Sequence, residues 1–308
     1  MTDGLKPHQV SVGIFVHNEE SVITKVLQSM LEQQSSYFQI SEIIVIATDC
    51  TDRSIELIKN HQKDDWRIQL IIEPKKLGKI FSVVHFLGEA SNDWCVISSG
   101  DVYPEENCLD VLFRELNEDP DSMRIGMFGP RVVPTLEEEM NVTQRINQEL
   151  WNVHHAISVN SPKLGELVVV NKSHLDEVKM NIGCDEVLLE EAITRNRHLL
   201  KYYSNATVFN FSPKRYSELF SYVRRVRAQH ILVHNYNGYS TSSYSIVKNL
   251  RCIVSGIRKR EIKIIGFIGL ALTIIPAFSL AKIDTLAGRN YLNWNRSEST
   301  RSKNSGLI

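Results

Sequence analysis

The first 115 residues alternate four times between a short apolar run and an amphipathic segment. The apolar runs have the length and composition of buried strands and cover residues 10–16, 43–47, 68–72 and 94–97. The other segments place apolar residues at helical spacing and cover residues 21–33, 53–61, 80–89 and 105–116, the last after Pro104. This alternation predicts an α/β fold: a doubly wound, mostly parallel sheet with helices on both faces.

The loops after these strands carry polar and charged residues, at positions 17–20, 48–52, 75–79 and 99–101. Because loops after parallel strands share one edge of the sheet, we expect the four loops to line one crevice. Neither Gly-x-Gly-x-x-Gly nor Gly-x-x-x-x-Gly-Lys-Ser/Thr occurs, which excludes the dinucleotide-binding and P-loop fingerprints.

Asp101 lies just past the buried run 94–97, after small residues. At that position a carboxylate can hold a hydrated divalent cation against substrate phosphates. A turn residue, or a cap for the following helix, is an equally good interpretation of the local sequence.

The later sequence continues the pattern. Strand-like runs cover residues 125–133, 166–170 and 207–211, and helix-like segments cover residues 143–159, 185–195 and 216–234. The helix 185–195 begins with two carboxylates, Asp185 and Glu186, and the helix 216–234 is strongly basic.

Taken in order, the loops resemble those of family 2 glycosyltransferases with a GT-A fold. The matching stretches are Val-His-Asn-Glu-Glu at 16–20, Ala-Thr-Asp-Cys-Thr-Asp at 47–52, Gly-Lys at 78–79 and Ser-Gly-Asp at 99–101. The resemblance implies a catalytic domain over residues 1–240 and a metal ligand, for Mg²⁺ or Mn²⁺, at Asp101. It implies nucleotide contacts at Val16, Asn18, Glu19, Thr48, Asp49, Asp52, Lys79, Ser99 and Gly100.

Two positions depart from the family pattern. Ser99 stands where the first Asp of Asp-x-Asp is expected, and Thr48 stands where a pocket Asp is expected, with Asp49 beside it. In the family those carboxylates serve the base and ribose of the donor. The identity of the donor nucleotide is therefore left open, whereas Asp101 keeps the metal-binding position.

Asp185 and Glu186 resemble the catalytic Glu-Asp pair of the family, with Glu186 at the usual position of the base and Asp185 as its rival. Carboxylates are also favoured in a first helical turn on dipole grounds alone. Arg225 matches the Arg of the family's Gln-x-x-Arg-Trp. Arg224 and Arg227 lie three residues apart, so both are expected to face a diphosphate leaving group. A solvated or membrane-facing basic surface is the alternative for these arginines.

The region expected to bind the acceptor contains Trp151, His154, His155, Lys163, Gly165 and Glu166. Trp151 and His155 are four residues apart and could stack on a sugar ring, although packing is the better interpretation of Trp151. His230 is a candidate ligand of low weight, because a lone helical histidine is usually a satisfied one.

Residues 241–308 are expected to form a basic linker, an apolar membrane-associated segment over residues 264–281 and a polar tail. The apolar segment has 18 uncharged residues, the lower limit for a span, and is flanked by Lys and Arg. A hairpin bent near Pro276, or a helix in the interface, fits this pattern better than a span or a buried core helix.

The distribution of charge suggests binding partners for the chain, and its cysteines suggest a cellular compartment. Residues 1–194 carry 16 Lys and Arg against 32 Asp and Glu, whereas residues 195–308 carry 19 against 4. The basic rear suggests contact with phosphates or an anionic membrane face. The five scattered cysteines indicate a reducing compartment, and the N-terminus lacks the features of a signal peptide, so the chain is expected to start in the cytoplasm.

The sequence thus predicts an inverting, metal-dependent glycosyltransferase at the cytoplasmic face of the membrane. Its donor is expected to be a nucleotide-diphosphate sugar, first of all a UDP-sugar, and its acceptor a glycan or lipid-linked hydroxyl; no nucleic acid is expected to bind. A non-catalytic scaffold with the same fold is the alternative that Thr48 and Ser99 favour. A sugar nucleotidyltransferase is a weaker alternative, because residues 17–20 lack the Gly-rich basic loop of that class.

Overall fold

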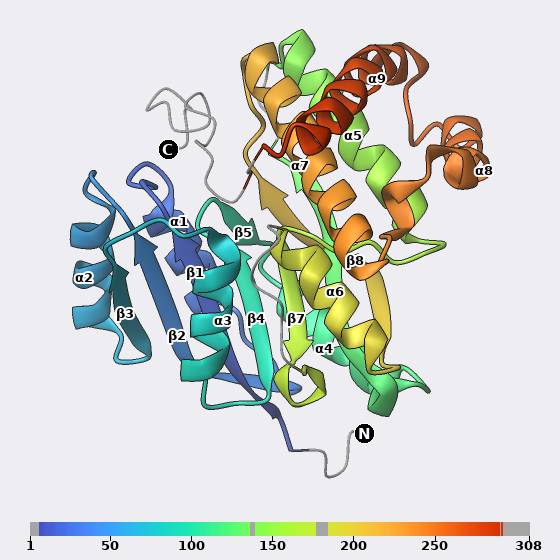
Figure 1. The fold of residues 1–308 in the computed structure, drawn as a ribbon. Helices are drawn as coiled ribbons and strands as arrows, with labels where there is room; N and C mark the ends of the chain where they lie inside the picture. Colours follow the sequence, from blue (N-terminus) through green and yellow to red (C-terminus); the bar gives the residue numbers. More distant parts are fainter. Residues whose placement is uncertain (1–5, 136–138, 177–183, 290, 292–308) are drawn as a thin grey trace.

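The computed structural model describes residues 6–135, 139–176, 184–289 and 291 of the chain. Within them, the strands form one sheet in the order β3-β2-β1-β4-β7-β6-β8-β5 (Figure 1). The strands are β1 (His8–Val16), β2 (Phe38–Thr48), β3 (Ile68–Glu73), β4 (Trp94–Ser99), β5 (Val102–Pro104), β6 (Ile125–Pro134), β7 (Leu167–Asn171) and β8 (Leu199–Asn210).

The sheet has a parallel half and a mixed half. The neighbours β3, β2, β1 and β4 are all parallel, as their alternation with helices predicts. β7 runs antiparallel to both β4 and β6, β8 runs parallel to β6, and β5 runs antiparallel to β8. The predicted strand 207–211 is the last part of β8, which begins at Leu199 because it pairs with β6 along its length.

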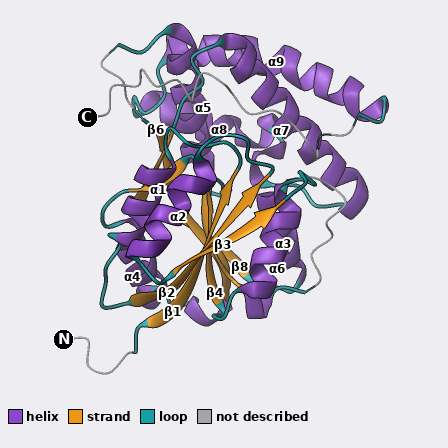
Figure 2. Ribbon diagram, turned by 90° about the vertical axis from the view of Figure 1, so that its left-hand side faces the viewer, coloured by secondary structure: helices purple, strands orange, loops and turns teal. Residues whose placement is uncertain are grey.

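Helices cover both faces of the sheet, as predicted, and Figure 2 shows the two layers. Side chains of α1, α2 and α4 pack on one face, and side chains of α3 and α6 pack on the other. These helices are α1 (Ile23–Leu31), α2 (Ser54–Asp64), α3 (Lys79–Glu89), α4 (Cys108–Glu118) and α6 (Asp185–Arg195). β1 serves both layers because its side chains alternate: Val12 and Ile14 belong to the first core, and Phe15 to the second.

Pro104 does not begin a helix, contrary to the sequence prediction. It ends β5, whose residues Val102–Pro104 pair with Asn210, Phe209 and Val208 of β8. α4 begins four residues later, at Cys108. A proline is tolerated here because β5 is the last strand of the sheet, and its missing N–H leaves no neighbouring strand without a partner.

Four helices form a third layer above the mixed half of the sheet (Figure 1). They are α5 (Val142–Ser158), α7 (Tyr216–Asn237), α8 (Ile246–Arg258) and α9 (Ile264–Leu286), and they share one apolar core. α5 and α9 approach closely at Gly266, where a Cβ atom would stand 2.4 Å from Cγ of Glu149. Glu149 also accepts a hydrogen bond from the backbone N–H of Lys263 (3.1 Å), which anchors the start of α9 to α5.

Two predictions for the C-terminal region are corrected. The expected linker contains α8, an amphipathic helix whose apolar side packs in the core of the third layer. The prediction of a hairpin bent near Pro276 is wrong, because α9 continues through Pro276 as one helix of 23 residues. Leu270, Thr273 and Ala277 are buried on both sides of the proline, and this packing holds the helix where one backbone hydrogen bond is lost. The predicted polar tail lies outside the described residues, apart from its first few.

α9 is long and apolar enough to cross a membrane, although one such helix is weak evidence for a span. Its buried side faces α5 and α7, and its other side is exposed, with Ile265 at 87% and Leu272 at 68%. A helix buried on all sides in a soluble core is therefore excluded.

Candidate active site

The loops after β1 and β2 are joined by hydrogen bonds between their own polar groups. The side-chain oxygen of Asn18 accepts from the backbone N–H of Thr51 (2.7 Å) and, more weakly, of Asp52 (3.3 Å). Asp52 in turn accepts from the backbone N–H groups of Glu20 and Ser54 (both 3.0 Å), and the N–H of the buried Glu19 donates to Ser54. Asn18, Glu19 and Asp52 thus set the shape of these loops, and their predicted nucleotide contacts stay predictions.

Thr48 is the last residue of β2, and its hydroxyl forms a hydrogen bond with a residue of β3. The hydroxyl donates to Oε2 of Glu73 (2.8 Å), which also accepts from Ser82 (2.6 Å). Burial would raise the pKa of Glu73, but hydrogen bonds from Ser82, His85 and Thr48 prevail and lower it. The carboxylate missing at position 48 is thus present one strand away. The sequence analysis missed Glu73, because only the pairing of Thr48 with Glu73 brings the two together.

The turn after β4 packs tightly against the end of β1. The N–H of Gly100 donates to the carbonyl of Phe15 (2.8 Å), and a Cβ atom at Gly100 would stand 2.8 Å from that same oxygen. Val16, buried at the end of β1, is the other neighbour of Gly100. Only glycine fits here, so Gly100 brings Asp101 close to β1, while Asp49, in the loop after β2, is exposed and has a left-handed φ of 49°.

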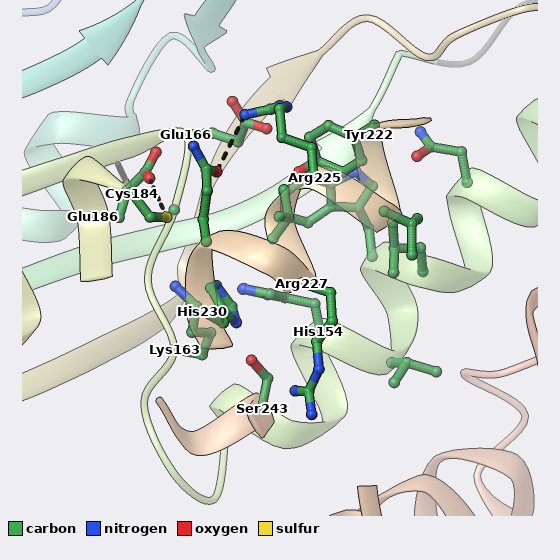
Figure 3. Close-up of a pocket in the computed structure, with 18 of the residues that line it drawn as sticks. His154, Lys163, Glu166, Cys184, Glu186, Tyr222, Arg225, Arg227, His230 and Ser243 are labelled. Carbon is green, nitrogen blue, oxygen red and sulfur yellow. Dashed lines mark hydrogen bonds between the residues drawn. The ribbon is translucent and has the colours of Figure 1, made fainter. Parts of the chain in front are cut away.

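A cavity of about 430 Å³ opens beyond Ser99 and Asp101 and extends under the third layer (Figure 3). Six of the predicted site residues line it: Lys79, Ser99, Asp101, Asp185, Glu186 and Arg225. Val16, Asn18, Glu19, Thr48, Asp49, Asp52, Gly100 and Arg224 are not among its lining residues. The tertiary structure therefore divides the predicted site into a set around the cavity and a set in the loops beside it.

Lys79 connects two parts of the cavity wall. As the first residue of α3, it follows Gly78, whose φ of 115° favours glycine. Its Nζ donates to the hydroxyl of Ser99 (3.0 Å) and lies 2.8 Å from Oδ2 of Asp185 and 3.4 Å from Oε1 of Glu186. Lys79 is buried, but these carboxylates raise its pKa, so it stays charged. Ser99 thus binds the lysine that orients the first turn of α6.

Asp185 and Glu186 form a close pair of carboxyl groups, of which Asp185 is buried and Glu186 is half-buried. Burial and the charge of Glu186 raise the pKa of Asp185 to about 6, against the pull of Lys79. Burial also disfavours ionised Glu186, but Lys79 and Lys163 outweigh it and lower the pKa of Glu186 to about 2. A general base works best with a pKa near the operating pH, and the two groups titrate as a pair, so Asp185 and Glu186 both stay candidates for the base.

Glu166 belongs to the same carboxylate group, although the sequence analysis placed it only among acceptor-binding residues. It precedes β7 with a left-handed φ of 63°, a conformation that is uncommon outside glycine. Burial and the nearby carboxylates of Asp101 and Glu186 raise the pKa of Glu166 to about 8. No spacing signal in the sequence brings Glu166 near Asp101; the antiparallel pairing of β4 with β7 does so.

Among the described residues, no group of three His, Cys, Asp or Glu side chains has the arrangement of a metal centre. The carboxylate of Asp101 nevertheless lies close enough to Glu166 to raise the pKa of Glu166. Next to Glu166, Oδ1 of Asn210 is buried and has no hydrogen-bond partner among the described residues. Carboxylate and amide oxygens are the ligands that Mg²⁺ and Mn²⁺ prefer, so the residues present fit a divalent cation in kind.

The three arginines of α7 take different positions. Arg225 lines the cavity near Glu166 and Glu186 and lies over the ring of Tyr222 (5.4 Å), and burial lowers its pKa. The expectation that Arg224 and Arg227 face one diphosphate is wrong. Arg224 makes two hydrogen bonds of 2.6 Å to Asp284 of α9, whereas Arg227 donates to the carbonyl of Tyr244 (2.8 Å).

The predicted aromatic pair is also separated. Trp151 is a buried part of the cavity wall and packs on His154 (5.1 Å between ring centroids), whereas His155 bonds to the hydroxyl of Tyr202 (2.9 Å). His154 and His230 line the cavity, and burial together with nearby Lys163 lowers the pKa of both to about 3. Both imidazoles are therefore neutral at physiological pH.

Comparison with known proteins agrees with this architecture. The sequence model of the glycosyl transferase family 2 matches residues 11–162. The matched residues make up just under half of the chain. This match covers the parallel half of the sheet, the carboxylate Asp101 and all of α5, and it supports glycosyl transfer as the class of reaction. A search of curated proteins gave no match.

Similar solved structures show that the chain has a GT-A fold. A mannosyltransferase from Pyrobaculum calidifontis, in complex with GDP-Man and Mn²⁺, is 13% identical with a TM-score of 0.62. The alignment covers 92% of this chain and 88% of that one. A mycobacterial protein is 16% identical with a TM-score of 0.51, over 72% of this chain and 73% of that one. At these identities the likeness concerns the fold alone.

Proposed function

We propose that this protein is an inverting glycosyltransferase that moves a sugar from a nucleotide-diphosphate donor to an acceptor hydroxyl at the cytoplasmic face of a membrane. The observation that carries the proposal is the group of four carboxylates, with Lys79 and Arg225, around one cavity at the end of β4. Its carboxylates are Asp101, Glu166, Asp185 and Glu186. Such a site has a base for the acceptor, oxygen ligands for a cation and a cation for the leaving group.

In the proposed reaction, the acceptor hydroxyl attacks the anomeric carbon of the donor in line. A bond forms between that carbon and the acceptor oxygen, and the bond to the diphosphate oxygen breaks. The hydroxyl proton passes to the Asp185–Glu186 pair, and the nucleoside diphosphate leaves with the electron pair of the broken bond. Lys79 keeps the pair ionised and oriented, since its Nζ contacts both carboxylates.

Arg225 is the proposed partner of the charge that develops on the leaving diphosphate. Its guanidinium is buried beside Glu166 and Glu186, where an ionic interaction is stronger than in water. Arg224 is proposed to hold α7 against α9 and not to contact the diphosphate, because its guanidinium is bound to Asp284. Asp101, with Glu166 and Asn210 beside it, would hold Mg²⁺ or Mn²⁺, which would neutralise charge on the donor diphosphate.

The donor nucleotide is proposed to bind along the loops of Val16, Asn18, Glu19, Thr48, Asp49 and Asp52. Glu73, which accepts a hydrogen bond from Thr48, offers one further carboxylate beside those loops for a base or ribose. UDP-sugars are the first donors to test. GDP-mannose is the second, because the similar solved structure from Pyrobaculum calidifontis contains GDP-Man.

The test is release of nucleoside diphosphate from UDP-sugars and GDP-mannose by the full-length protein, with and without Mn²⁺. We expect release that depends on Mn²⁺ and falls by about 10²-fold or more in Asp101→Asn, since charge stabilisation of this kind has that magnitude. The matched control is Asp110→Asn on α4, which removes a surface carboxylate paired with Arg114. A folded protein that releases diphosphate from none of these donors would instead be a scaffold.

Membrane attachment is proposed through the exposed side of α9. Ile265, Ile268 and Leu272 lie on this side, and Arg258, Lys259 and Arg260 precede the helix on the surface. We expect the protein to float with vesicles that contain anionic lipid, and the triple variant Ile265→Gln, Ile268→Gln, Leu272→Gln to stay in the soluble fraction. A wild-type protein that remains soluble without detergent and ignores such vesicles would contradict this part.

A further inference from the structure

The cavity changes character along its length. Its carboxylates lie at the end of the sheet, and its far wall is apolar and comes from the third layer. That wall consists of side chains from α5, α8 and α9: Leu150, Val153, Ile157, Ile253, Phe267, Leu270, Ala271, Ile274 and Phe278. A sugar or a glycan would bind poorly against so much hydrocarbon surface, because its hydroxyl groups would lose hydrogen bonds to water there without gaining hydrogen bonds to the protein.

Basic side chains lie between these two parts. Arg227, Lys163, His154 and His230 all line the cavity, and Figure 3 shows them grouped together, apart from Glu186. The guanidinium of Arg227 lies between the rings of Tyr244 (4.2 Å) and Phe278 (4.5 Å), so it stands where the basic part meets the apolar part. Lys163 is paired with the carboxylate of Glu190 (3.2 Å), whereas Arg227 donates to a neutral acceptor, the carbonyl of Tyr244 (2.8 Å), and keeps its positive charge available at this junction.

The apolar part of the cavity reaches the surface that we assign to the membrane. Ile275 of α9 lines the cavity and is also 64% exposed. Next to it, Ile268 and Leu272 of α9 are exposed, and α8 exposes Val247 and Val254. A hydrocarbon chain could therefore pass from a bilayer at this surface into the cavity without crossing water.

We propose that the acceptor is a phosphate-linked lipid. Its hydrocarbon chain lies against α5, α8 and α9, its phosphate binds at Arg227, and its reacting hydroxyl points to the Asp185–Glu186 pair. This inference rests on the proposed function for the reaction and adds the class of the acceptor. The order of the three parts of the cavity, carboxylate, cation and hydrocarbon, matches the order of the three parts of such a lipid.

The test measures binding directly and does not depend on turnover. Brominated hexadecyl phosphate is added to the full-length protein, and quenching of tryptophan fluorescence is compared between wild type and Trp151→Phe. Trp151 lines the cavity, whereas Trp66 is 83% exposed on the far side of the sheet's parallel half. We expect saturable quenching in the wild type that is largely lost in Trp151→Phe. Equal quenching in both proteins would overturn the proposal.

Two neighbouring positions on α9 provide a matched pair of variants. Ala271→Phe adds a ring inside the cavity, whereas Leu272→Phe adds one on the exposed side of the same helix. We expect Ala271→Phe to weaken binding of hexadecyl phosphate by about tenfold or more, and Leu272→Phe to leave it unchanged. The same loss in both variants would mean that the chain binds the outer surface of α9. Thermal stabilisation by nucleoside diphosphate with Mn²⁺, retained in Ala271→Phe, would exclude simple misfolding.

Ligands that lack either the long hydrocarbon chain or the phosphate test the two parts of the proposed site one at a time. Hexyl phosphate should bind at least tenfold more weakly than hexadecyl phosphate, because its shorter chain buries fewer methylene groups in the cavity. Arg227→Gln should weaken hexadecyl phosphate by about tenfold but leave hexadecanol unchanged. Equal affinity for hexyl phosphate and hexadecyl phosphate would reject the proposed hydrocarbon-binding site. Equal affinity for hexadecanol and hexadecyl phosphate would reject phosphate binding at Arg227. Alkyl phosphate binding without any binding of nucleoside diphosphates would refute the proposed function but not the lipid site.

Discussion

The crevice at the edge of the sheet has two sides that use polar residues in opposite ways. On the side of β1 and β2, Asn18, Asp52 and Thr48 bond to neighbouring loops and strands. On the side of β4 and β7, Asp101, Glu166 and the first turn of α6 surround an open cavity. The first arrangement satisfies its hydrogen bonds internally and shapes the backbone. The second brings several carboxylates together around a cavity, where Lys79 offsets the charge of Asp185 and Glu186 but Asp101 still raises the pKa of Glu166.

Removing the proposed base is the strongest test of this difference. Asp185→Asn or Glu186→Gln should lower kcat by about 10²- to 10⁴-fold, the usual contribution of a general base, while donor affinity stays nearly unchanged. The variant with the larger loss identifies the base. Glu191→Gln on the same helix is the control, because Glu191 pairs with Arg195 (3.1 Å) and does not line the cavity. Full activity in both Asp185→Asn and Glu186→Gln would reject the pair as the catalytic centre.

The contact between α7 and α9 should affect stability and not chemistry. Arg224→Ala leaves the buried Asp284 without its bidentate partner and should lower the free energy of unfolding by about 2 kcal/mol. Arg289→Ala removes a second, mostly exposed cation from the same carboxylate (3.1 Å) and should cost less than about 0.5 kcal/mol. Denaturation with urea measures both. If Arg224→Ala kept its stability and lost kcat instead, Arg224 would belong with Arg225 at the leaving group.

The pH profile of the reaction tests the Asp185–Glu186 pair as the base. Because the pKa of Asp185 is raised to about 6, a reaction that uses Asp185 loses the ionised base as the pH falls below that value. We expect kcat/KM to fall by about tenfold per pH unit below pH 6. Since the two groups titrate as a pair, the limb belongs to the pair. A profile that stays flat to pH 4.5 would favour Glu186, whose pKa is lowered to about 2.

The smallest effect is expected on the side of β1 and β2. Asn18 adopts a left-handed φ of 58° and accepts the hydrogen bonds that hold the next loop. Asn18→Ala should cost about 1–2 kcal/mol of stability, from both the conformation and the lost bonds, and Asn18→Gly should cost less because glycine tolerates this φ. The KM for the donor should rise more than kcat falls. An Asn18→Ala variant with wild-type stability and tenfold lower kcat would place Asn18 with the catalytic group.

Much of the site was visible in the sequence because it follows strands directly. Asp101, Lys79 and the Asp185–Glu186 pair each stand at a strand or helix end that hydrophobic periodicity locates, and all line the cavity. Glu73 was not predicted, and Glu166 was predicted only as an acceptor-binding residue, because their neighbours come from strand pairing between distant segments. α8 was predicted to be a linker because its sequence is rich in basic residues. Its apolar side is buried only by packing against the other helices of the third layer.

The sequence by itself determined the parallel half of the sheet, the helices on its faces and the loops that meet at its edge. Those features depend on local periodicity, which strands and helices express without help from the rest of the chain. Only the tertiary structure decided that Arg224 binds Asp284, that α9 passes through Pro276, and that an apolar cavity continues from the carboxylates. These features depend on which side of α7 and α9 is buried, and that is set by packing between helices far apart in the sequence.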